Sequence, residues 1–81
     1  MDTNEILKQI NVLICEVLED DSIVVNLQTT AADVEGWDSL NHAILIAEVQ
    51  KKFKIRFDLS EVLSFKNVGD MCLSVQKKIG N

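Results

Sequence analysis

Apolar residues recur at helical spacing in three stretches of this chain, and no stretch offers a pair of strands. The first stretch carries Ile6, Ile10, Leu13, Ile14, Val17 and Leu18, and the last carries Met71, Cys72, Val75 and Ile79. A helix with such a stripe buries it against other helices when no sheet is available to cover it. The pattern therefore predicts an all-α fold, a four-helix bundle of three long helices and one short helix.

The helix bounds follow from these stripes and from residues that cap helix ends. The expected helices are Asp2 or Thr3 to about Leu18, Ser39 to about Lys52, Leu59 to Leu63, and a last helix that begins after Asn67. The expected caps are Asp2, Asp38, Asp58 or Ser60, and Asn67. The first and last of these caps have an acidic residue three positions later, Glu5 and Asp70, which is the spacing of a capping box.

The connection between the first two helices runs through Trp37 and is long for a compact domain. It must therefore be anchored by its own side chains, and we expect Val25, Leu27, Val34 and Trp37 to do this. Its β-branched stretch from residue 23 to 27 has no partner strand elsewhere in the chain, so we predict an ordered loop. Trp37 could instead contact a partner protein, but the anchor is the preferred interpretation.

Length and composition indicate one soluble domain spanning residues 1–81. The chain has 81 residues, of which 47% are hydrophobic and 26% charged, values typical of a folded globular protein. No apolar run approaches the length needed to span a bilayer, and the first residues are acidic and polar where a signal peptide would be basic. We therefore expect a cytoplasmic monomer with no membrane insertion.

The two cysteines and the acidic residues of the chain predict neither a metal site nor a disulfide. Cys15 and Cys72 lie far apart, outside any metal-ligand spacing, and each falls in a predicted helix, so we expect buried, reduced thiols. The acidic turn Asp20-Asp21-Ser22 lacks the alternating ligands and central glycine of a calcium-binding EF-hand loop. This turn is expected to be solvated.

Charge is distributed unevenly along the chain. The net charge is −5, and no lysine or arginine occurs from Gln9 to Gln50. An anionic surface of this kind repels a phosphate backbone, which argues against nucleic acid as a partner. It favours encounters with basic proteins, although the same charges could serve only solubility.

The second predicted helix is apolar around most of its circumference. If Leu45, Ile46, Val49 and Phe53 face the core, a second apolar strip, Leu40, Ile44 and Ala47, bordered by Glu48 and Lys51, remains near solvent. An exposed apolar strip commonly marks a partner-binding surface. The alternative is a central helix that is buried on both sides.

A serine stands at the head of this helix, in the run Gly36-Trp37-Asp38-Ser39-Leu40. The unpaired N–H groups and the dipole at a helix N-terminus stabilise a phosphate attached to such a hydroxyl. Most serines in this position are caps with no further role. The position alone therefore leaves both interpretations open.

These residues nevertheless resemble the acyl carrier protein family over nearly the whole chain. The resemblance is carried by Asp38-Ser39-Leu40, by Phe53-Lys54-Ile55 at the end of the helix, and by Phe65-Lys66-Asn67-Val68-Gly69-Asp70 before the last helix. It implies that a holo-acyl-carrier-protein synthase, a phosphopantetheinyl transferase, attaches 4′-phosphopantetheine from coenzyme A to Ser39. It also implies that Asp38 helps the synthase to hold its magnesium ion.

By the same resemblance, the chain is a carrier and not an enzyme. Acyl intermediates of fatty-acid or other lipid metabolism would form thioesters on the arm, and acyl ligases, transferases and synthases would dock on the second helix. The implied docking residues are Leu40, Asn41, Ile44, Ala47 and Glu48. Because this helix carries Asn41 and His42 where primary fatty-acid carriers are usually acidic, the chain looks more like a specialised carrier.

Three other functions compete for the same residues. A peptidyl or aminoacyl carrier is possible, although Trp37 and Asp38 stand where such carriers more often have two glycines. A helical interaction domain with no prosthetic group would use Leu40 and Ile44. A serine hydrolase with Ser39 and His42 is disfavoured, because no glycine-framed nucleophile elbow surrounds the serine.

Overall fold

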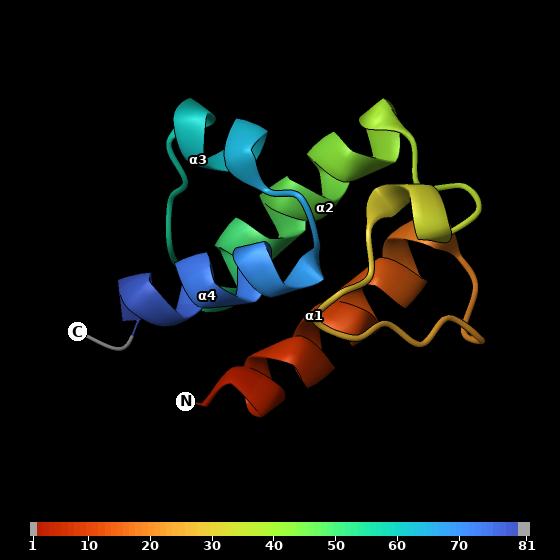
Figure 1. Ribbon diagram of the computed structural model, residues 1–81, viewed down its shortest axis with the longest axis horizontal. Helices are drawn as coiled ribbons and strands as arrows, with labels where there is room; N and C mark the ends of the chain where they lie inside the picture. The colour runs from red at the N-terminus through yellow and green to blue at the C-terminus, as the bar shows by residue number, and fades with distance from the viewer. Residues whose placement is uncertain (1, 80–81) are drawn as a thin grey trace.

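The computed structural model describes residues 2–79 and contains four α-helices in the predicted order. They are α1 (Thr3–Leu18), α2 (Ser39–Phe53), α3 (Leu59–Ser64) and α4 (Val68–Ile79), with a single 3₁₀ turn, η1 (Ala31–Asp33), between α1 and α2. No strand occurs within the described residues. The all-α bundle of three long helices and one short helix is therefore confirmed, together with the long loop that separates the first two helices (Figure 1).

The core lies where α1 packs against both α2 and α4. In Figure 1, α1 runs from the lower centre towards the right side of the bundle, and α3 lies apart from it at the upper left. The buried apolar side chains are Ile6, Ile10, Leu13, Ile14, Val25, Leu45, Ile46, Val49, Val68, Met71, Cys72 and Val75. All but Val25 come from the three long helices, so burial of their stripes supplies most of the hydrophobic stabilisation.

The helix ends agree with the expected caps, with small differences in length. Asp2 accepts a hydrogen bond from the backbone N–H of Glu5 at 2.8 Å, and Asp58 forms a reciprocal capping box with Glu61. α2 ends at Phe53, one residue beyond the prediction, and α3 also ends one residue later, at Ser64. Each of these differences lies within the usual fraying of helix ends.

The cap of α4 differs in detail from the predicted box. Asn67 Oδ1 accepts from the N–H of Asp70 at 2.9 Å, as the spacing predicts. The carboxylate of Asp70, however, accepts from the N–H of Lys66, also at 2.9 Å, and thus fixes the residue before the cap.

The loop between α1 and α2 is held by a side chain that the sequence analysis did not single out. Asn11, on α1, donates to the carbonyl of Ile23 at 2.9 Å and accepts from the N–H of Val25 at 2.6 Å. Val25 is buried, whereas its neighbour Val24 is 88% exposed. The amide of Asn11 thus takes the place of a partner strand, which is why this β-branched segment forms an ordered loop.

The two cysteines have different environments. Both are free thiols, and Cys72 is buried, as predicted. The prediction of a buried Cys15 is wrong, because this residue is only half-buried and its Sγ lies 3.3 Å from the carbonyl oxygen of Ile23 at the surface of α1. Burial raises the pKa of the Cys72 thiol to about 11, so this thiol stays protonated at neutral pH.

Candidate functional site

Ser39 is the first residue of α2 and its side chain is exposed. α2 starts in yellow-green at the edge of the bundle in Figure 1 and then runs back towards the core. Asp38, also exposed, precedes it as the N-cap, with Oδ1 accepting from the N–H of Asn41 at 2.8 Å. The hydroxyl of Ser39 is therefore presented at the positive end of a helix of 15 residues.

The backbone before Ser39 makes a tight turn at Gly36. Gly36 has φ +89°, a left-handed conformation that side chains with a Cβ rarely adopt. Its carbonyl oxygen accepts from the N–H of Asp38 at 3.0 Å and from Nδ2 of Asn41 at 2.8 Å. The turn and the first turn of α2 therefore form one hydrogen-bonded unit around the serine.

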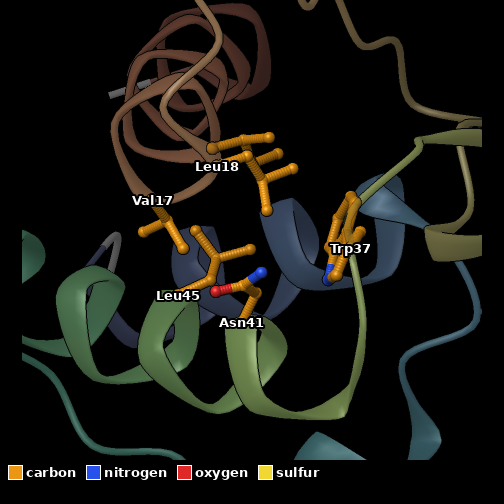
Figure 2. Close-up of a pocket in the computed structure, with 6 residues that line it drawn as sticks. Val17, Leu18, Trp37, Asn41 and Leu45 are labelled. Atoms are coloured by element: carbon orange, nitrogen blue, oxygen red, sulfur yellow. The ribbon is translucent and has the colours of Figure 1, made fainter.

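Trp37 anchors this unit to the bundle. Its ring is partly buried against the core, as the anchor interpretation predicts. Figure 2 shows Trp37 facing Leu18 of α1, with Asn41 and Leu45 of α2 below the gap between them. This small apolar pocket is also lined by Ile14 and Val17 and is too narrow for a water molecule.

His42 interacts with Trp37. Its Nδ1 accepts a hydrogen bond from the indole Nε1–H of Trp37 at 3.0 Å, and the two rings stack with centroids 6.0 Å apart. Burial lowers the pKa of His42 below its usual value, because desolvation disfavours the charged imidazolium. The Nδ1 lone pair, with which His42 would act as a general base, thus already accepts the indole N–H of Trp37. This adds to the case against a hydrolase that uses Ser39 and His42.

The outer face of α2 carries the predicted exposed apolar strip. Leu40 is 70% exposed and Ile44 is 42% exposed, and Ala47 is exposed as well. Leu45, Ile46 and Val49 of the same helix are buried. The alternative of a helix buried on both sides is therefore wrong.

A groove between α1 and α2 adjoins this strip and was not predicted from the helical pattern. It has a volume of about 360 Å³ and is lined by Glu16, Val17, Glu19, Ile44 and Glu48. Glu48 also lies 3.8 Å from the ammonium group of Lys51. Helical spacing on α1 alone could not reveal the groove, because its two walls belong to different helices.

Two further observations concern metals and membranes. No group of three or more metal-ligating side chains of histidine, cysteine, aspartate or glutamate gathers anywhere in residues 2–79. Over the same residues, no helix has both the length and the hydropathy needed to cross a bilayer.

The site fits a phosphopantetheine group. Its chemistry requires a hydroxyl that can form a phosphoester, is open to a transferase and leaves room for a long arm, and the exposed hydroxyl of Ser39 meets these requirements. The fold and the site together define a carrier scaffold, in which a helical bundle displays an exposed serine at the head of α2. Consistent with this class, the sequence pattern of the family described as "Phosphopantetheine attachment site" matches residues 8–75.

Two known proteins that are similar to this chain show which kind of carrier it is. An acyl carrier protein of Phytoplasma australiense is 30% identical over 74 residues, which cover 91% of this chain and 97% of that protein. The solution NMR structure of a holo acyl carrier protein from Geobacter metallireducens matches with a TM-score of 0.86 and 40% identity, covering 91% of this chain and 85% of that chain. The chain belongs to the acyl carrier protein family.

Membership in this family defines what the chain does. It is a carrier, not an enzyme, and its prosthetic group is 4′-phosphopantetheine. The group supplies a terminal thiol on a flexible arm, and the acyl group is held there as a thioester. Because the cargo is tethered, its effective concentration at a docked enzyme is high.

Proposed function

We propose that Ser39 is the residue that receives the arm. In this reaction Oγ of Ser39 forms a bond to the phosphorus of the phosphopantetheine moiety of coenzyme A. The phosphoanhydride bond of coenzyme A breaks, adenosine 3′,5′-bisphosphate leaves, and the hydroxyl proton passes to a base on the transferase. The observation that carries this proposal is the exposed serine at the first position of α2.

Asp38 supports the same step in two ways. One carboxylate oxygen caps α2 through the N–H of Asn41 and so fixes the backbone next to the serine. Because Asp38 is also exposed, its carboxylate can approach the magnesium ion that the transferase brings to the pyrophosphate.

The partner surface proposed for the carrier is the outer face of α2 with the adjoining groove. Its residues are Leu40, Asn41, Ile44, Ala47 and Glu48, joined by Glu16 and Glu19 across the groove. Apolar side chains at its centre and carboxylates at its edge suit a partner that presents an apolar patch with basic residues around it. The phosphopantetheinyl transferase and the acyl ligases, transferases and synthases would dock here in turn.

The cellular role proposed for the carrier is lipid metabolism in the cytoplasm, in fatty-acid biosynthesis or a more specialised acyl pathway. It would act there as a single-domain monomer spanning residues 1–81. Asn41 and His42 stand at the start of α2 where primary fatty-acid carriers are usually acidic, and this difference favours the specialised role.

Intact-mass measurement tests the attachment site. The wild-type chain, produced with a broad-specificity phosphopantetheinyl transferase, should gain the mass of one phosphopantetheine, whereas Ser39→Ala should gain none. Ser60→Ala is the matched control, because Ser60 is exposed near the start of α3, and it should be modified like the wild type. An unmodified wild type, or a modified Ser39→Ala, would refute the proposal.

A further inference from the structure

Ser39 lies between two hydrogen bonds that join α2 to the segment before it. Nδ2 of Asn41 donates to the carbonyl of Gly36 at 2.8 Å. Nε1 of Trp37 donates to Nδ1 of His42 at 3.0 Å. Each bond connects a residue before the serine to a residue after it, so the two bonds together restrain the backbone on both sides of Ser39.

The bond between Trp37 and His42 is fixed at both ends. The indole packs against the core and faces Leu18 of α1, as Figure 2 shows. His42 lies within α2, one helical turn after Ser39, and its ring stacks on the indole with an interplanar angle of 27°. A partly buried bond between two packed rings restrains the chain more firmly than a contact between exposed, flexible side chains.

We propose that Trp37 and His42 are positioning residues for the transfer of phosphopantetheine. Their hydrogen bond holds the backbone from Trp37 to Ser39 in one conformation and thereby sets the direction in which Oγ of Ser39 meets the phosphorus of coenzyme A. This inference rests on the proposed function, in which Oγ forms the new phosphoester bond and adenosine 3′,5′-bisphosphate leaves. Neither ring takes part in bond making.

The expected effect is on the rate of transfer within the complex and not on docking. In-line attack requires the oxygen and the phosphorus to be closely aligned, and a misplacement of about 1 Å can cost as much as a hundredfold in rate. The apolar strip of Leu40 and Ile44 projects from another face of α2 and does not depend on the indole hydrogen bond. Loss of that bond should therefore lower kcat while leaving KM for the carrier nearly unchanged.

The test measures transfer from coenzyme A to the purified apo-carrier by a phosphopantetheinyl transferase. Trp37→Phe keeps an aromatic ring but removes the donor, and His42→Ala removes the acceptor. Each should lower kcat by about tenfold. The double variant should be no slower than either single variant, because both remove the same bond. His42→Asn, which offers an amide oxygen as acceptor, should recover most of the lost rate.

NMR gives a second measurement that does not depend on the transferase. The chain has one tryptophan, so its indole N–H gives a single resonance. In the wild type this proton should exchange slowly with solvent, and in His42→Ala it should exchange faster. Thermal unfolding of each variant checks that the variant is folded before its kcat and its indole exchange rate are compared with those of the wild type.

Several outcomes would overturn the inference. These are an unchanged kcat in both single variants, a rise in KM alone, additive losses in the double variant, and an indole exchange rate that does not respond to His42→Ala. Modification of the wild type at Ser39 together with any of these refutes the positioning role alone. A wild type that takes up no phosphopantetheine refutes the proposed function as well.

Discussion

At the scale of single residues, Asn11 has the largest structural role that the sequence pattern did not reveal. Its position on α1 is compatible with an ordinary polar helix residue, and nothing near it in sequence indicates a partner. The partners are 12 and 14 residues away, at Ile23 and Val25. Such a contact depends on how the loop folds back over α1, which local spacing does not encode.

Asn11→Ala should therefore destabilise the protein. The substitution leaves the N–H of Val25 without its partner and the carbonyl of Ile23 with only the weak thiol donor of Cys15. This should cost about 1–3 kcal/mol in the free energy of unfolding. Urea denaturation measures this difference. Asn4→Ala is the matched control, because Asn4 is exposed on the same helix and should be neutral or slightly stabilising. Equal effects of the two substitutions would contradict the assigned role of Asn11.

At the scale of elements, α3 is attached to α4 through one carboxylate. Glu61 Oε1 accepts from the N–H of Asp58 and lies 2.9 Å from the ammonium group of Lys78. Oε2 accepts from the hydroxyl of Ser74 at 3.0 Å. These donors, the backbone N–H of Asp58 first, lower the pKa of Glu61 from its usual 4.5 to about 2. The ionised form of Glu61 thus stabilises the position of α3.

This network predicts a dependence of stability on acid. Because the pKa of Glu61 is lower in the folded state, its contribution is fully present above about pH 4.5 and is lost as the pH falls towards 2. Glu61→Gln should therefore lower the free energy of unfolding at pH 6, and its difference from the wild type should shrink as the pH falls through this range.

Ser64→Ala serves as the control for this pH series. The hydroxyl of Ser64 donates to the backbone carbonyl of Glu61 and carries no charge, so its effect should be the same at every pH. A difference between Glu61→Gln and wild type that stays constant from pH 6 to pH 2 would contradict the role of the carboxylate. Denaturant titration at each pH supplies the values.

The helices themselves could be predicted from sequence, whereas contacts between them could not. The stripes and caps predict all four helices, because they depend on residues three and four apart. The hydrogen bond between Trp37 and His42 also joins near neighbours, but it forms only because the core fixes the orientation of the indole. The groove that includes Glu16 and Ile44 requires the relative placement of α1 and α2.

At the scale of the whole molecule, the long loop is closed over the start of α4. The carbonyl oxygens of Leu27 and Thr29 accept from the first N–H groups of α4, those of Gly69 and Val68, each at 2.8 Å. These bonds satisfy helix donors that would otherwise lack partners. The approach is so close that a Cβ at Gly69 would lie 2.7 Å from the carbonyl oxygen of Leu27.

Gly69→Ala tests this closure through the sign of its effect. In an ordinary helix position, alanine is more stable than glycine by about 0.5–1 kcal/mol. Here the added methyl group must push the loop backbone away from α4, which should cost about 1–3 kcal/mol. Thermal or urea unfolding should therefore show a less stable protein, and a more stable one would contradict the close contact.

Exposed apolar side chains occur on α2, α3 and α4, so the face that binds partners is identified by comparing variants on different helices. Leu40 lies on α2 beside the proposed attachment residue and is 70% exposed, whereas Leu73 lies on α4 and is 56% exposed. Truncation of an exposed leucine costs little stability in either place. A rise in KM can therefore be assigned to weaker docking and not to unfolding of the variant. The two leucines thus form a matched pair for comparing two faces of one molecule.

Leu40→Ser should raise KM for transfer of phosphopantetheine to the carrier, and Leu73→Ser should leave it unchanged. An apolar contact at the centre of an interface is worth about 1–2 kcal/mol, or roughly a tenfold change in KM. The kinetics are measured with coenzyme A at saturation and the carrier as the varied substrate. If Leu40→Ser left KM unchanged, docking would not depend on the outer face of α2, and if Leu73→Ser raised KM as much, docking would not be specific to that face. A leucine carries no charge, whereas the carboxylates of the groove are screened by salt. The ratio of the KM of Leu40→Ser to the KM of the wild type should therefore stay the same when salt is added.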